Sequence, residues 1–270
     1  MLAIQVPRSL LFWAGSLMLA FWIVVAIGGQ HITPYDPQAV DPVNRLTAPS
    51  RIHWFGTDRL GRDLFSRVLS GAREVLLVAP VAAFLGTAFG TLLGLAAGYF
   101  GGLFDEFLNR CADALLSIPV LLLGLLALTA LGPSRAVIVA VVATIFTPLV
   151  MRTIRSAVLS ERGKEYIQLA LLRTESDLSI LIRELFPNVA GLAVTELLLR
   201  SGYAVFLTAT LSFLGLGLQP PSAEWGVIIY EHYGFLPNGI WWPVLFPVAA
   251  VASLILAFQF VAQGLSGGQR

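Results

Sequence analysis

The sequence predicts an all-α membrane protein with about six transmembrane helices, and three observations lead to this fold class. Hydrophobic residues make up 57% of the 270-residue chain, and charged residues make up only 12%. A soluble domain carries about 25% charged residues, so much of the surface must face lipid instead of water. The apolar residues also gather into long runs, which can satisfy their backbone polar groups in lipid only as helices.

The first apolar run extends from Leu10 to Gly28 and follows Arg8. Such a run after a basic residue is also typical of a cleaved signal peptide. Its 19 residues exceed the 7–15 of a signal peptide's apolar region, and they can cross a hydrocarbon core of about 30 Å. We therefore expect residues 1–28 to form a retained N-terminal transmembrane helix.

Five further apolar runs predict the remaining spans, in a five-helix core over residues 74–270. They are Val75–Tyr99, Ala114–Leu131, Ala136–Val150, Val189–Leu214 and Pro243–Val261. Ala136–Val150 is short for a span, so it must include Met151 or lie where the bilayer is thin. Six spans place both termini on one side of the membrane. That side carries slightly more Arg and Lys residues, which favours cytoplasmic termini under the positive-inside rule.

A polar segment, residues 29–73, separates the first two spans and is expected to be an extracytoplasmic loop. It begins with several prolines and then shows helical periodicity from about Thr57 or Asp58. Asp58–Arg62 and Asp63–Arg67 have the acid-to-base spacing that supports a helix. We expect an amphipathic helix that lies at the membrane surface.

A second polar segment, residues 152–188, lies on the side of the termini. Glu165–Leu172 is a short helical run, and the spacing of Thr174 and Asp177 favours the start of a new helix that continues until Pro187. Two short helices joined by a turn would form a compact docking knob. The alternative is an ordinary cytoplasmic loop.

Composition also excludes several classes of function. A net charge of +1 gives no indication of a nucleic-acid partner, and the bilayer is the one partner that composition predicts. The single cysteine, Cys111, leaves no internal disulfide and no cysteine-based metal site. The only lysine, Lys164, is not part of a phosphate-binding loop. We therefore predict no catalytic, cofactor-binding or metal-binding residues and no ATPase site in this chain.

Three separated motifs carry a resemblance to a known family over nearly the whole chain. They are HWFGTDRLGRD at His53–Asp63, GYFGG at Gly98–Gly102 and LSFLGLG at Leu211–Gly217. In this order they resemble the second permease subunit of the dipeptide, oligopeptide and nickel ABC importers. The resemblance implies the type I importer permease fold and a subunit that forms half of a translocation pathway.

The resemblance also implies partners and leaves the substrate open. Such a subunit pairs with a second homologous permease in the cell membrane. Two ABC ATPase subunits bind ATP and Mg²⁺, and an extracytoplasmic binding protein delivers the substrate. Di- and oligopeptides are the favoured substrates, and nickel or a metal chelate is the alternative.

The family's cytoplasmic coupling motif falls in register with residues 165–188. The resemblance assigns ATPase coupling to Glu165, Tyr166, Ala170, Leu172, Thr174, Ser176, Arg183 and Pro187. Thr174 replaces the family's glycine, and this substitution removes easy access to a left-handed turn. We expect Thr174 to cap the next helix instead.

A glycine stripe and a charged pair stand out within the predicted spans. Gly86, Gly90, Gly94 and Gly98 recur every four residues, which favours close helix packing; the alternative is that they line the pathway. Glu196 and Arg200 have i,i+4 spacing in the fifth span, where ionisable groups are costly. They form either a pathway pair or a structural pair. His31, His53 and His232 are expected in loops or at the membrane interface; the alternative is that they contact a metal or metal chelate during import.

Two other classes of function remain as remote alternatives. An intramembrane enzyme would need catalytic groups at membrane depth, but the predicted spans contain no histidine and, apart from Glu196, no internal carboxylate. A secondary transporter should show inverted repeats and broken helices, and neither is evident in the sequence.

Overall fold

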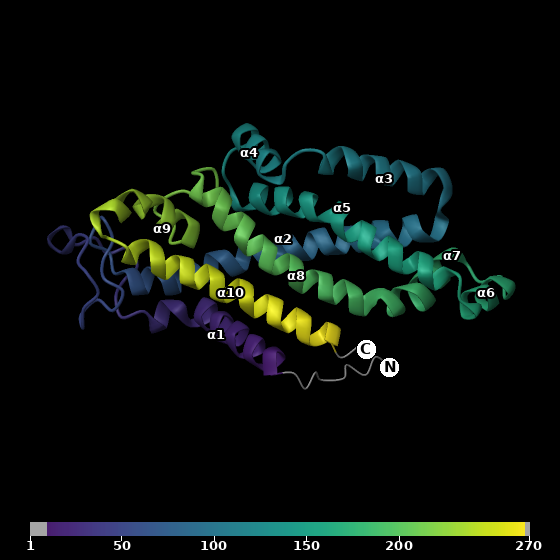
Figure 1. The fold of residues 1–270 in the computed structure, drawn as a ribbon, viewed down its shortest axis with the longest axis horizontal. Helices are drawn as coiled ribbons and strands as arrows, with labels where there is room; N and C mark the ends of the chain where they lie inside the picture. The colour runs from purple at the N-terminus through teal and green to yellow at the C-terminus, as the bar shows by residue number, and fades with distance from the viewer. Residues whose placement is uncertain (1–9, 268–270) are drawn as a thin grey trace.

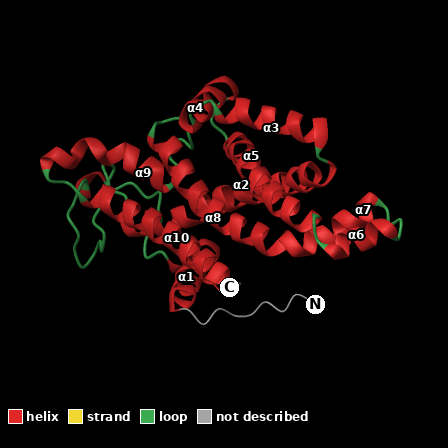
Figure 2. Cartoon of the chain, turned by 45° about the vertical axis from the view of Figure 1, so that its right-hand side comes forward, coloured by secondary structure: helices red, strands yellow, loops and turns green. Residues whose placement is uncertain are grey.

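The computed structural model describes residues 10–267, in which long helices run side by side (Figure 1). Residues 1–9 of the predicted first segment and residues 268–270 of the predicted core lie outside the described residues. Apart from one isolated bridge between Thr57 and Asp63, the described residues form helices and loops (Figure 2). The predicted all-α membrane fold is confirmed.

Within the described residues, five helices are long and apolar enough to cross a membrane. They are α1 (Leu10–Ile32), α2 (Leu64–Phe100), α5 (Arg135–Arg162), α8 (Phe186–Phe213) with the helical turns before it, and α10 (Trp242–Gly267). Of the two alternatives for the short run Ala136–Val150, the structure shows the first: α5 has 28 residues and includes Met151.

The predicted span Ala114–Leu131 is not a single straight helix. It is divided between α3 (Gly102–Leu116) and α4 (Val120–Leu131), which meet at an angle of 82°. Pro119 lies at the break and caps α4. A proline lacks a backbone N–H and restricts the residue before it, so the break falls where the sequence places this proline. Counted as one bent span, the pair brings the number of crossings to six.

The amphipathic helix expected from Thr57 or Asp58 is absent, and a tight turn takes its place. The Asp58 carboxylate accepts hydrogen bonds from the backbone N–H groups of Leu60 and Arg62. Gly61 has a φ of +78°, which leaves the helical region. Asp63 then caps α2 by accepting the N–H of Ser66 at 2.8 Å. The polar residues of the expected outer face are therefore mostly buried in this turn.

The second polar segment is also smaller than the 152–188 expected from sequence. Its first part, residues 152–162, forms the last turns of α5, and its second part continues into α8. Between them lie α6 (Glu165–Leu172), α7 (Asp177–Ser179) and the π-helical turns η2 (Ile180–Leu185). Pro187 does not end the helix. The N–H of Phe186 bonds to the carbonyl of Leu181, five residues back, and this wider π turn carries the helix past the proline.

The two ends of the bundle differ in what they carry. The start of α1 and the end of α10 lie toward the end that holds α6 and α7 (Figure 1). The opposite end holds residues 33–63, with the short helix η1 (Pro42–Asn44), together with α9 (Trp225–His232) and η3 (Tyr233–Asn238). We call these the knob end and the lobe end, respectively, and we call residues 33–63 the lobe.

Candidate functional site

The knob, residues 163–176 with α6 at its centre, rests on the ends of three long helices. Ile167 and Ala170 of α6 are fully buried. They belong to a hydrophobic cluster that includes Tyr99 of α2, Val158 of α5 and Leu185 of η2. Burial of this face fixes α6 against the bundle.

A Schellman motif ends α6, with Thr174 at the position where glycine is usual. The N–H of Thr174 bonds to the carbonyl of Leu171 at 3.0 Å, and the N–H of Glu175 bonds to the carbonyl of Ala170 at 3.2 Å. Thr174 takes a φ of +54° to make this possible. The expectation that Thr174 caps the next helix is wrong. Ser176 caps α7 by accepting the N–H of Ser179.

Polar contacts at the base hold the knob to the bundle. The Tyr99 hydroxyl donates to Asp177 at 2.7 Å. The Tyr166 hydroxyl donates to Glu161 at 2.8 Å and accepts from Asn188 at 3.1 Å. Burial and the bond to Glu161 raise the pKa of Tyr166 to about 12, so its hydroxyl remains protonated and able to donate. These bonds join α6 and α7 to the ends of α2, α5 and α8.

The outward face of the knob combines apolar and charged side chains. Leu169 and Leu172 are exposed, with Leu172 at 79%, and so is Leu178 of α7 just beyond the knob. Glu165, Thr174, Ser176 and Arg183 are also exposed, while Pro187 is half-buried at the start of α8. Exposed leucines on a rigid knob at the end of the bundle are typical of a docking surface.

The glycine stripe of α2 faces α5 along its whole length. A Cβ atom added to Gly86, Gly90, Gly94 or Gly98 would lie 2.7–2.8 Å from the nearest atoms of α5. These atoms belong to residues from Phe146 to Val158. The two backbones therefore approach as closely as the small residues allow.

Glu196 and Arg200 form an ion pair within α8. The carboxylate oxygen Oε2 of Glu196 accepts from Nε of Arg200 at 3.0 Å and lies 2.8 Å from its Nη2. The guanidinium carbon of Arg200 also lies 5.9 Å from the ring centres of Phe146 and Tyr203. Glu196 is buried, so the pair keeps a carboxylate neutralised inside a membrane helix.

A buried charge cluster at the lobe end was missed by the sequence analysis. Asp58 pairs with Arg62 and lies 3.5 Å from Arg67, and all three side chains are almost fully buried. Glu231 of α9 accepts from Arg59 at 2.8 Å and from Arg62 at 3.2 Å. The cluster joins the lobe to α2 and α9. Its signal in the sequence was the concentration of charges in Asp58–Arg67 of a chain that is otherwise poor in charge.

His232, expected in a loop or at the interface, lies beside this cluster and is fully buried. Its Nε2 accepts from the backbone N–H of Arg59 at 3.1 Å, and its Nδ1 donates to the carbonyl of Ile228. Burial lowers the pKa of the imidazole below its ordinary value. The ring is therefore held in its neutral form, with the proton on Nδ1.

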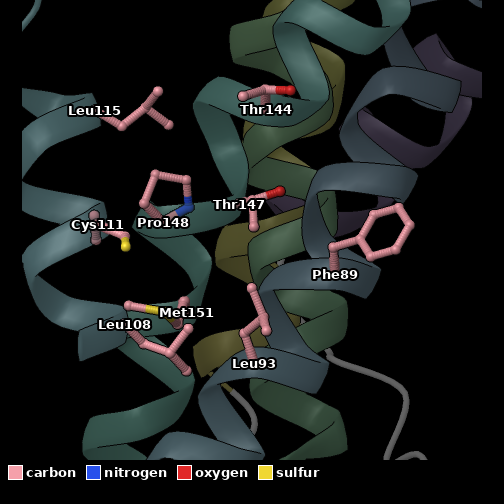
Figure 3. A pocket seen from close by; sticks show the side chains of 10 residues that line it. Phe89, Leu93, Leu108, Cys111, Leu115, Thr144, Thr147, Pro148 and Met151 are labelled. Carbon is pink, nitrogen blue, oxygen red and sulfur yellow. The ribbon is translucent and has the colours of Figure 1, made fainter. Parts of the chain in front are cut away.

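A groove of about 370 Å³ separates α3 from α2 and α5 (Figure 3). Its lining is apolar except for Thr144, Thr147 and Cys111. Both threonine hydroxyls donate to backbone carbonyls of their own helix. The groove is therefore an apolar surface on which both threonine hydroxyl groups are satisfied.

Comparison with known proteins identifies the family. Residues 90–269 match the family described as the binding-protein-dependent transport system inner membrane component. A dipeptide transport system permease protein of Alkalihalophilus pseudofirmus is 34% identical over 261 residues, which cover 97% of this chain and 86% of that protein. The corresponding protein of Bacillus subtilis is 32% identical, with 97% and 82% covered. A glutathione transport system permease protein of Shigella dysenteriae is 38% identical over 262 residues, with 96% and 85% covered.

These comparisons confirm the resemblance that the three sequence motifs carry. The long helices and the knob between α5 and α8 occur in the same order as the resemblance implies. The chain belongs to the family of binding-protein-dependent transport system inner membrane components.

Proposed function

We propose that this chain is one permease subunit of an ABC importer for di- or oligopeptides. The observation that carries the proposal is the similarity, over almost the whole chain, to permease subunits named for dipeptide, peptide and glutathione transport. Nickel, the alternative substrate, has no support among these relatives. The chain supplies half of the pathway, and a second homologous permease supplies the other half.

The knob is the surface through which ATP hydrolysis acts on this subunit. Two ATPase subunits bind ATP and Mg²⁺, and one of them receives α6 with its exposed Leu169 and Leu172. The Schellman turn at Thr174 and the bonds of Tyr166 support this role, because they make the knob rigid enough to transmit a displacement.

The proposed orientation places the knob end in the cytoplasm and the lobe end outside. Six crossings put the start of α1 and the end of α10 on the knob side, so both termini are cytoplasmic. An extracytoplasmic binding protein delivers peptide at the lobe end. Glu196 and Arg200 lie between these ends, where they serve either as part of the pathway wall or as a structural pair.

Transport by the reconstituted importer tests this function. The chain is assembled in proteoliposomes with its partner permease, ATPase subunits and binding protein. We expect ATP-dependent uptake of radiolabelled di- or tripeptide and no uptake of a nickel chelate. Chelate uptake without peptide uptake would reassign the substrate. A lack of uptake of either, with ATPase activity intact, would contradict the function itself.

A further inference from the structure

A groove of about 650 Å³ lies between α1, α2 and α10. From α1 it is lined by Leu19, Ile23, Ala26 and Ile27, which lie on one face of that helix. From α2 it is lined by Leu76, Leu77 and Pro80, and α10 contributes Phe258. All three helices are candidate membrane spans, so the groove runs along the part of the molecule that lies in the bilayer.

One cationic side chain, Arg73, lies among these apolar groups. It precedes the apolar run of α2, whereas Pro80 lies two turns further along the helix, a rise of about 10 Å. The cation therefore marks the end of the groove nearest the lobe, just outside the apolar run Val75–Tyr99. The rest of the lining is hydrocarbon.

Arg73 is exposed, and among the described residues it has no ion-pair or hydrogen-bond partner. Its neighbour in the sequence, Glu74, pairs with Arg135 at 2.7 Å. A guanidinium binds phosphate strongly because it presents several N–H donors in a planar fork. An unpaired guanidinium at one end of an apolar groove thus matches a molecule with an anionic head and a hydrocarbon chain.

We propose that this groove is a specific phospholipid site, with the phosphate on Arg73 and an acyl chain along Leu76, Pro80 and Ile23. The groove between α3 and α5 provides a contrast. It has a similar apolar lining and no cationic residue, so no group there selects a head group. The lipid packs against the exposed surface of α1, because only 17% of the most apolar stretch of that helix is buried by the rest of the protein.

The test measures lipid binding to the purified permease complex after delipidation. Native mass spectrometry follows the titration with dioleoyl phosphatidylglycerol, and glycerol phosphate serves as the head-group-only probe. Arg73→Gln should weaken lipid binding about fivefold, the effect of one cation at a membrane surface. Arg73→Lys should keep most of the affinity. Arg51→Gln is the matched control, because Arg51 is exposed on the lobe and does not line this groove.

The acyl-chain half of the site has its own variant. Ala26→Phe places a ring in the groove and leaves Arg73 unchanged, so it should also reduce lipid binding. Glycerol phosphate at the same concentration as the lipid should fail to displace the lipid from the wild type, because it lacks the acyl chains. At equal concentration, added lipid should raise the melting temperature of the wild type and of Arg51→Gln more than that of Arg73→Gln. Equal lipid affinity of Arg73→Gln and Arg51→Gln would overturn the proposal. A crosslink from Leu77→Cys to the second permease would also overturn it, because a protein would then cover the groove.

Discussion

At the scale of single residues, Thr174 occupies a backbone conformation that costs a residue with a Cβ atom about 1–2 kcal/mol. Its φ of +54° is needed for the two hydrogen bonds that end α6. Thr174→Gly should therefore raise the free energy of unfolding by about 1 kcal/mol, since part of the gain is offset by the greater chain entropy of glycine.

The measurement is the unfolding midpoint of the purified complex. Ser176→Ala serves as the control. Loss of that helix cap should lower the free energy of unfolding by about 1 kcal/mol and so shift the midpoint the other way. A lower midpoint for Thr174→Gly would show that the threonine side chain stabilises the turn in some other way.

The Glu196–Arg200 pair allows a double-mutant cycle. Removal of one charge leaves the other unneutralised in a low-dielectric setting, at a cost of about 3–5 kcal/mol, whereas removal of both does not. Glu196→Gln or Arg200→Gln alone should reduce folded complex more than the double variant does. Folded complex and peptide uptake are measured for all four proteins.

The two readouts separate the roles left open for this pair. A structural pair predicts that the double variant recovers both assembly and uptake, and a pathway pair predicts recovered assembly with uptake still impaired. Strictly additive losses of stability would mean that the two side chains do not interact.

His232 predicts a pH dependence at the lobe end. Its Nε2 can accept the N–H of Arg59 only while the ring is neutral, and a protonated ring would add a cation close to Arg59. Because its pKa in the folded protein is lowered, the unfolded chain binds the proton more readily. The stability that His232 contributes is fully present above about pH 6.5, and it is lost as the pH falls through the lowered folded pKa.

The measurement is the melting temperature between pH 7.5 and pH 5. His232→Gln keeps an acceptor for Arg59 but does not titrate, so the decrease on acidification should be smaller than in the wild type. Identical pH profiles would assign the decrease to other groups.

At the scale of elements, the contact of α2 with α5 is set by the glycine stripe. A leucine at Gly90 would bring its Cβ atom to 2.7 Å from the carbonyl oxygen of Thr147, and one at Gly94 to 2.7 Å from that of Met151. Because these are backbone atoms, α5 would have to move away. Gly90→Leu and Gly94→Leu should each cost about 3 kcal/mol or more.

The yield of folded complex in membranes measures this effect. Gly234→Leu is the matched control, since Gly234 is exposed, is not among the residues with a positive φ, and has no atom within 4 Å of the added Cβ position. Normal yields for both stripe variants would count against tight packing here.

The elements predicted best from the sequence are those whose secondary structure depends on local composition. The apolar runs gave the spans, and Glu165–Leu172 has the bounds expected of it. The turn at Thr57–Asp63 could not be foreseen, because its charges are neutralised by Glu231, 169 residues from Arg62. With no knowledge of that distant partner, helical periodicity favours an exposed polar face. Pro187 was misread for a local reason: a π turn satisfies the backbone around it.

At the scale of the whole molecule, the proposed orientation predicts a contact between the knob and an ATPase subunit. After replacement of the exposed native Cys111 by serine, a cysteine at Leu172 or Glu175 should crosslink to that subunit in membranes. A cysteine at Val43, which is 91% exposed on the lobe, should not. Labelling of position 172 or 175 from outside intact cells would show that the knob is extracytoplasmic and would contradict the proposed orientation.

The charge cluster at the lobe end also determines when this part of the protein can fold during its synthesis. Arg62 leaves the ribosome 169 residues before Glu231, an interval of roughly 10–30 s at ordinary rates of synthesis. Throughout that time the nascent lobe lacks the carboxylate that α9 will provide. Until α9 arrives, Arg62 is paired only with Asp58 and Arg59 has no carboxylate partner, so the last sixth of the chain is needed to complete the cluster.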